Sequence, residues 1–203
     1  EINVMASDIN RADDPLTERV LRTAASLGIQ RYRMKYYKYD RARSVTKQLD
    51  EFRPMVKDLA AMNRELGITG VYQNHAGAYY VGSTIWDLHE LFNSYSIKEF
   101  AIAFDIRHAT AEAGMSWPVL FNVATSQLGA VYVKDFVWDG NKPKNVPLGN
   151  GRVSKQFFKQ LAATNFAGPI SLHIEYLPEG TVAENLAAIK RDLGALKSWL
   201  LKK

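Results

Sequence analysis

The chain has 203 residues, of which 47% are apolar and 23% are charged, a composition typical of a globular domain with one core and not of a disordered chain. It contains no cysteine, which excludes disulfides, thiolate metal sites and a cysteine nucleophile. The 26 basic and 21 acidic side chains give a net charge of +5, and no uncharged apolar run of about 18 residues is present to span a membrane.

Short β-rich runs alternate with longer helical patterns along the chain. Six runs predict strands, over residues 3–7, 29–37, 68–75, 100–106, 130–136 and 169–176. Apolar residues at helical spacing predict helices between and after them, over residues 16–27, 45–62, 85–95, 117–128, 157–162 and 186–200. Thr181 and Glu184 have the spacing of a capping box at the start of the last helix.

Two segments depart from this regular pattern. Pro54 lies inside the second helical pattern, where it is expected to kink or divide the helix. Residues 137–152 are rich in Gly, Pro and Asn and show neither helical nor strand periodicity. We therefore expect this second segment to be a long irregular loop.

Repeated strand-then-helix units predict an α/β fold with a parallel sheet and helices outside it. The sheet either curves into a barrel or stays open and doubly wound. No Gly-rich dinucleotide or Walker loop follows a strand, which disfavours the Rossmann and P-loop folds. About six βα units are present, whereas a complete eight-unit barrel needs about 250 residues, so the chain is short by one or two units.

Polar residues gather where the predicted strands end, although a buried parallel strand should be almost entirely apolar. Side chains alternate faces along a strand, so Gln73 and His75 share one face, and the same spacing relates polar pairs on the fifth and sixth strands. The polar residues that these strand ends would bring together are Gln73, His75, Asp105, Tyr132, Lys134, His173 and Glu175. In α/β barrels the carboxyl-terminal mouth of the strands holds the active site.

The strand-end motifs resemble those of a known family. They are Tyr72-Gln73-Asn74-His75, Phe104-Asp105-Ile106-Arg107-His108-Ala109, Val133-Lys134-Asp135, Pro147-Leu148-Gly149-Asn150-Gly151 and the segment 168–176. Together they are similar to the sugar phosphate isomerase/epimerase proteins of the xylose-isomerase-like TIM-barrel superfamily, which also contains endonuclease IV. The resemblance implies one parallel (β/α) TIM-type barrel domain over residues 1–203, in which the missing one or two units are N-terminal.

In that family one divalent metal ion at the barrel mouth is bound by residues of four strands. By resemblance, Asp105 and Glu175 match two of the carboxylate ligands, whereas Gln73 stands in place of a Glu or His and Tyr132 in place of a His. Two alternatives follow. The first, which the resemblance favours, retains Mn²⁺, Mg²⁺ or Zn²⁺ on Gln73, Asp105 and Glu175 with a nearby histidine. The second is a metal-free site in which histidine and lysine perform acid–base chemistry.

The expected reaction is abstraction of a proton next to a sugar carbonyl, which isomerisation, epimerisation and β-elimination from a keto-sugar share. We expect Glu175 to be the base, Lys134 or a metal to stabilise the enediolate oxygen, and His173 to transfer protons. The substrate-binding residues that we expect are Arg33 and Lys35 for a phosphate or carboxylate, His75 and His108 for the sugar oxygens, and Trp138 for a sugar face.

Three other functions compete with this prediction. Gln73 and Tyr132 could mark a decayed site in a non-catalytic sugar-binding barrel, and a keto-sugar lyase would use the same first step. A nuclease related to endonuclease IV is disfavoured because the chain has only four histidines.

The expected partner is a small sugar or sugar phosphate, without nucleic acid or membrane, although basic residues and tyrosines cluster over residues 31–43. The open sheet edges are expected to be covered by a partner chain or by a second copy of this chain, or the sheet is expected to close more tightly than eight strands. The expected compartment is the cytoplasm, with the periplasm after signal removal as the alternative.

Overall fold

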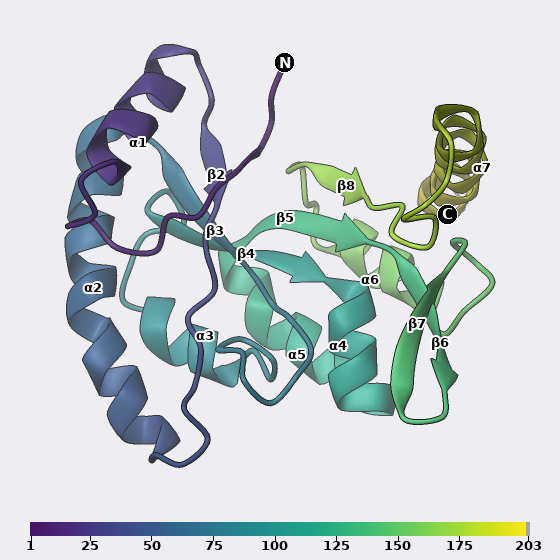
Figure 1. The fold of residues 1–203 in the computed structure, drawn as a ribbon, viewed down its shortest axis with the longest axis horizontal. Helices are drawn as coiled ribbons and strands as arrows, with labels where there is room; N and C mark the ends of the chain where they lie inside the picture. The colour runs from purple at the N-terminus through teal and green to yellow at the C-terminus, as the bar shows by residue number, and fades with distance from the viewer. Residues whose placement is uncertain (202–203) are drawn as a thin grey trace.

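The computed structural model describes residues 1–201. Six strands form one parallel sheet in the order β1-β2-β3-β4-β5-β8, with helices packed outside it (Figure 1). The strands are β1 (Met5–Ala6), β2 (Arg31–Arg33), β3 (Thr69–Gln73), β4 (Phe100–Asp105), β5 (Leu128–Val133) and β8 (Ile170–Leu172). Within the described residues β1 and β8 do not pair with each other, so the sheet is an open, curled arc. The predicted TIM-type fold with six βα units is confirmed.

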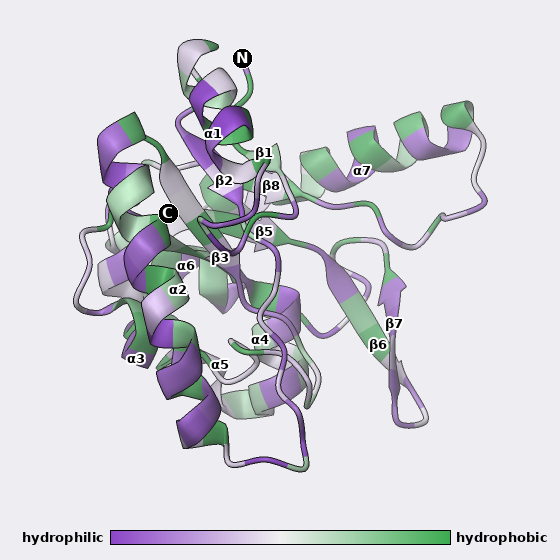
Figure 2. Cartoon of the chain, turned by 60° about the vertical axis from the view of Figure 1, so that its left-hand side comes forward, coloured by the Kyte–Doolittle hydropathy of each residue, from purple (hydrophilic) through white to green (hydrophobic). Residues whose placement is uncertain are grey.

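Seven α-helices lie within the described residues. They are α1 (Thr17–Ser26), α2 (Val45–Leu66), α3 (Trp86–Phe92), α4 (Ile106–Ala113), α5 (Trp117–Ala124), α6 (Gln156–Ala163) and α7 (Val182–Leu201). The predicted capping box opens α7, because the backbone N–H of Thr181 donates to Glu184 and that of Glu184 donates back to the Thr181 hydroxyl. Figure 2 shows α7 extending beyond the rest of the chain. None of the helices within residues 1–201 has the length and hydrophobicity needed to cross a bilayer.

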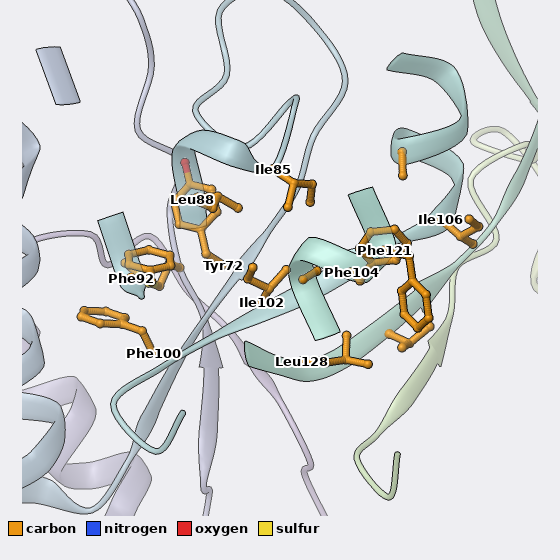
Figure 3. Close-up of a cluster of buried hydrophobic side chains, with 14 of the residues drawn as sticks. Tyr72, Ile85, Leu88, Phe92, Phe100, Ile102, Phe104, Ile106, Phe121 and Leu128 are labelled. Carbon is orange, nitrogen blue, oxygen red and sulfur yellow. The ribbon is translucent and has the colours of Figure 1, made fainter. Parts of the chain in front are cut away.

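The main apolar core lies between the sheet and its covering helices. Tyr72, Ile102 and Phe104 point from β3 and β4 toward α3 and α5, and all three are fully buried (Figure 3). The rings of Phe92 and Phe100 stack with their centroids 4.8 Å apart at one end of this layer. Because side chains alternate along a strand, the residues between them face the inside of the arc.

The inner face of the arc carries a second, smaller apolar cluster. Ala101 and Ala103 of β4 lie there beside Val71, Ala130 and Tyr132 of the neighbouring strands. These side chains are mostly small, so they fill the arc only in part. Asp105 continues the same alternation as Ala101 and Ala103, which places its carboxylate on the inner face at the carboxyl end of the sheet.

Two connections differ from expectation. Pro54, which is exposed, does not divide α2, and the helix is continuous over 22 residues. The first part of the segment 137–152 is not irregular, since β6 (Asp135–Asp139) pairs with β7 (Lys142–Val146) as an antiparallel hairpin, whereas residues 147–152 contain no helix or strand. Gly140 supplies the positive φ of 56° that its two-residue turn requires.

The fourth predicted strand is one residue shorter than expected and leads directly into a helix that the sequence patterns did not predict. Asp105 is the N-cap of α4, and its carboxylate accepts a hydrogen bond of 3.1 Å from the backbone N–H of His108. Arg107 and His108 therefore lie in the first helical turn and not at a strand end. The second and sixth strands are also shorter, so that His173 and Glu175 follow β8.

Asp135 holds the loop after the hairpin in place. Its buried carboxylate accepts hydrogen bonds of 2.9 to 3.0 Å from four backbone N–H groups, those of Phe136, Gly149, Gly151 and Val153. A Cβ at Gly151 would lie 2.3 Å from an Asp135 oxygen, which explains the glycine there. Asp135 is therefore a structural residue.

Replacing Asp135 by alanine is expected to lower the free energy of unfolding by about 3 kcal/mol, because several buried N–H donors lose a charged acceptor. Urea unfolding measures this change. Asp139→Ala is the matched control, since Asp139 is exposed on the same hairpin. Equal stability of the two variants would contradict the role of Asp135.

Candidate active site

The carboxyl ends of the strands surround a cleft of about 700 Å³. The predicted site residues that line it are Arg33, Gln73, His75, His108, Lys134, His173 and Glu175. The pairs expected from side-chain alternation, such as Gln73 with His75, do face the same space. Three predicted residues do not line this cleft: Asp105 is fully buried beside Lys134, Lys35 is exposed to solvent, and Trp138 lines a separate cavity with Trp117.

Lys134 joins the two carboxylates of the site. Its Nζ donates to Glu175 Oε1 and Oε2 at 2.8 and 3.0 Å and lies 3.4 Å from Asp105 Oδ2. The side chain of Lys134 is 6% exposed and that of Asp105 is fully buried, whereas Glu175 lies at the rim with 44% of its side chain exposed. A buried ammonium group thus lies beside a carboxylate that solutes can reach.

Both carboxylates are held in their ionised form. Hydrogen bonding from His173, together with Lys134, keeps the pKa of Glu175 well below its usual range. Burial acts to raise the pKa of Asp105, but the Lys134 ammonium and the hydrogen bonds from the His108 backbone N–H and the Gln73 amide outweigh it, so this pKa also lies below its ordinary value. Both groups therefore remain charged at neutral pH.

A hydrogen-bond chain fixes the inner wall of the cleft. The Tyr36 hydroxyl donates to Gln73 Oε1 at 2.7 Å, and Gln73 Nε2 donates to Asp105 Oδ2 at 2.8 Å. Asn74 bonds both backbone groups of Asp105, accepting from its N–H at 2.6 Å and donating to its carbonyl at 3.1 Å. Asn74 therefore ties the ends of β3 and β4 together and positions the Asp105 carboxylate.

Two of the histidines in the cleft are neutral. Burial lowers the pKa of His108 to about 3 and also lowers the pKa of His75. His108 Nδ1 accepts from the Ala76 N–H at 3.2 Å and lies 3.1 Å from an Arg107 nitrogen, so the ring proton is on Nε2. This buried Nε2–H has no hydrogen-bond partner within the described residues, and it lies 3.7 Å from Asp105 Oδ2.

The neutral state of His108 predicts a loss of stability in acid. Its folded pKa of about 3 lies below the ordinary value of 6.5, so between these values the unfolded chain binds more protons than the folded one. The free energy of unfolding should therefore fall as the pH falls from 6.5 to 4, by up to about 1.4 kcal/mol per pH unit for this group. Urea unfolding at several pH values measures the slope. His108→Gln should make it shallower, and an unchanged slope would contradict this assignment.

The residues present do not fit the divalent ion that the resemblance implies. The oxygen of Gln73 already accepts from Tyr36, so its NH₂ group faces Asp105, and burial raises the pKa of Tyr132 to about 12, which keeps the phenol protonated. The Lys134 ammonium group lies between the two carboxylates that would bind the ion. No group of three His, Cys, Asp or Glu in residues 1–201 is arranged to bind a metal. We derive no step through a metal ion.

Sequence reasoning did not assign roles to two residues of the cleft. Tyr36 lies beyond the end of β2, so the strand predicted over residues 29–37 does not give the direction of its side chain. Arg107 is only 7% exposed and lines the cleft from the first turn of α4. The signal for Arg107 was a charged residue two positions after Asp105 within the same motif, but its orientation depends on the unpredicted helix.

A parallel (β/α) sheet with a polar cleft at the carboxyl ends of its strands defines a TIM-barrel type of domain. The chain belongs to the xylose isomerase-like TIM barrel family, whose sequence pattern matches residues 16–199. No functionally curated protein matches the chain significantly in sequence.

Several solved structures share this fold. A D-tagatose 3-epimerase-like protein is 18% identical, with a TM-score of 0.75 over 98% of this chain and 78% of that one. The 3-keto-D-glucoside 4-epimerase of E. coli is 15% identical, with a TM-score of 0.71 over 97% of this chain and 79% of that one. A D-psicose 3-epimerase determined in the presence of D-fructose is 15% identical, with a TM-score of 0.72 over 97% and 78% of the two chains. At these identities the similarity establishes the fold.

Proposed function

We propose that the cleft abstracts a proton next to the carbonyl of a sugar, as an isomerase or epimerase does, with Glu175 as the base and Lys134 as the cation that stabilises the carbonyl oxygen. One observation carries this proposal: Lys134 Nζ lies 2.8 Å from Glu175 and 3.4 Å from Asp105 within a cleft large enough for a sugar. Two of the structural neighbours are named as sugar epimerases or as similar to one, which supports the proposal.

The proposed step uses Glu175 in the ionised form that its environment favours. A carboxylate oxygen of Glu175 takes the proton from the carbon beside the carbonyl, and the C–H electron pair becomes a carbon–carbon double bond. The carbonyl oxygen then carries the negative charge, and the Lys134 ammonium donates a hydrogen bond to it. Asp105, which is buried beside Lys134, holds the ammonium group in place.

The fate of the intermediate decides the product. Return of the proton to the opposite face of the same carbon gives an epimer. Return to the former carbonyl carbon gives an isomer, provided that a proton also moves between the two oxygens. That second transfer needs a group that takes the proton from one oxygen and returns it to the other. The neutral ring of His75 is suited to this, because its Nδ1 donates to the Ala76 carbonyl at 2.8 Å and its Nε2 is left to accept and return the proton. The unpartnered Nε2–H of His108 can donate a hydrogen bond to the oxygen that carries the charge.

In this proposal the Lys134 ammonium takes the role that a metal ion would have at the carbonyl oxygen. The Mn²⁺, Mg²⁺ or Zn²⁺ expected from the resemblance has no part in it, because Gln73, Tyr132 and Lys134 do not form a donor set for such an ion. The proposed partner is a small sugar, and coverage of the open sheet edges by a second copy stays a prediction.

Exchange of carbon-bound hydrogen with D₂O tests the proposal before the product is known. Keto-sugars and their phosphates are incubated with the protein in D₂O, and loss of the signal of the proton beside the carbonyl is followed by NMR. We expect exchange with at least one of these compounds. Binding without exchange would contradict the proposal and favour a non-catalytic sugar-binding domain.

A further inference from the structure

Arg107 is a buried cation without a carboxylate partner. It is 7% exposed and lines the cleft, and no Asp or Glu within residues 1–201 forms an ion pair with it. Its Nε is buried and has no hydrogen-bond partner in the same part of the chain. The carboxylates of Asp105 and Glu175 act on this charge only from a distance, and no acidic group of the described structure contacts it.

The position of Arg107 makes its unpaired charge unfavourable for the free energy of folding. A buried charge is expensive unless it is paired, and the first turn of a helix such as α4 favours anions over cations. The groups that the guanidinium contacts are neutral: His108 Nδ1 lies 3.1 Å away and the Phe136 ring centroid 5.1 Å away. Arg107 in these surroundings is therefore not expected to stabilise the folded protein.

Arg33 faces the same cleft with a second unpaired charge. It lines the cleft, its guanidinium lies 5.5 Å from the ring centroid of Tyr36, and it forms no ion pair with an acidic residue in the described structure. Lys134, by contrast, contacts both Glu175 and Asp105. The three cations Arg33, Arg107 and Lys134 outnumber these two carboxylates, so the cleft presents a net positive charge.

We propose that Arg107, together with Arg33, forms an anion subsite, so that the compound bound in the cleft is a sugar carrying a carboxylate or a phosphate group. The planar guanidinium group binds either anion through paired hydrogen bonds. The proposal rests on the proposed function and narrows its substrate class. Lys35 was predicted to contact the anion, but it is exposed outside the cleft. In this proposal Arg107 makes that contact instead.

The subsite adjoins the reacting groups. Arg107 contacts one nitrogen of His108, and the other nitrogen of that ring lies 3.7 Å from Asp105, which in turn contacts Lys134. Only the imidazole ring of His108 therefore lies between Arg107 and Asp105, the carboxylate that contacts Lys134. One small molecule can occupy both.

Three probes that differ only at carbon 6 test this inference: D-fructose, D-fructuronate and D-fructose 6-phosphate. Calorimetry measures their affinities for the intact protein. We expect at least one anionic probe to bind about tenfold or more tightly than D-fructose. Comparison of the two anionic probes decides between carboxylate and phosphate.

Arg107→Met is expected to remove this preference, so that the anionic probe binds no more tightly than D-fructose does. The matched control is Arg19→Met, since Arg19 is exposed on α1 and should leave all three affinities as they are. Because the substitution removes an unpaired buried charge, the Tm of Arg107→Met should equal or exceed that of the unmodified protein.

Equal affinities for the three probes, or an unchanged preference in Arg107→Met, would overturn the inference. A lower Tm with an unchanged preference would assign Arg107 a purely structural role. Failure of the proposed function would give a different result. The anionic probes would then still bind more tightly than D-fructose, but no proton exchange with D₂O would be observed.

Discussion

Lys134→Met is expected to lower the rate of proton abstraction by about 100- to 1,000-fold, the loss that follows removal of one donor to a developing oxyanion. Methionine keeps an unbranched side chain of similar length but cannot stabilise the enediolate oxygen. The pKa of Glu175 should also rise, because Lys134 is one of the groups that lower it. Solvent deuterium exchange under saturating substrate measures the loss.

The control for Lys134→Met must separate chemistry from folding. Lys159→Met removes a lysine exposed on α6 and should leave exchange unchanged. Loss of Lys134 leaves the buried Asp105 carboxylate without its cation, so the variant should also unfold more easily, by about 3 kcal/mol. Exchange is therefore compared at a temperature at which both proteins are folded. A folded Lys134→Met protein with full exchange activity would contradict the proposed role.

Glu175→Gln is expected to lower proton abstraction by about 1,000-fold while leaving substrate affinity nearly unchanged. The amide keeps the size of the side chain and one oxygen that accepts from Lys134, but it cannot take a proton at neutral pH. Initial rates over a range of substrate concentrations separate the effect on kcat from that on KM.

Glu179→Gln is the matched control for Glu175, because Glu179 is exposed four residues further along the same segment. It should leave kcat and KM unchanged. If Glu175→Gln retained its kcat, the base would have to be another group of the cleft, and the neutral His75 would be the next candidate.

The strand-end residues of the cleft were predictable because they depend on local rules. Alternation along a parallel strand places Tyr132 and Lys134 on one face, and the parallel order brings their ends to one edge of the sheet. The six βα units were predictable from the periodicity of apolar residues, and the family was predictable from the motifs at the strand ends. Both signals are read along the chain. No packing information was needed for either.

What could not be predicted depends on turns and on single hydrogen bonds. The helix that carries Arg107 begins because Asp105 caps it, and the same carboxylate had already been interpreted as a metal ligand. The hairpin turn at Gly140 was hidden in a segment without periodicity. The orientation of the Gln73 amide follows from the Asp105 carboxylate, which can only accept and lies 32 residues away in the chain, and the Tyr36 hydroxyl then donates to the amide oxygen. These two contacts decide against Gln73 as a metal ligand, and nothing in the local sequence encodes them.

The central claim is that this cleft abstracts a proton beside a sugar carbonyl with Lys134, and not a divalent ion, stabilising the charge. Deuterium exchange by protein stripped of metal with a chelator tests it most directly. We expect the stripped protein to retain its full exchange rate and added Mn²⁺, Mg²⁺ or Zn²⁺ not to increase it. Exchange that disappears on stripping and returns with one of these ions would contradict the proposed role of Lys134.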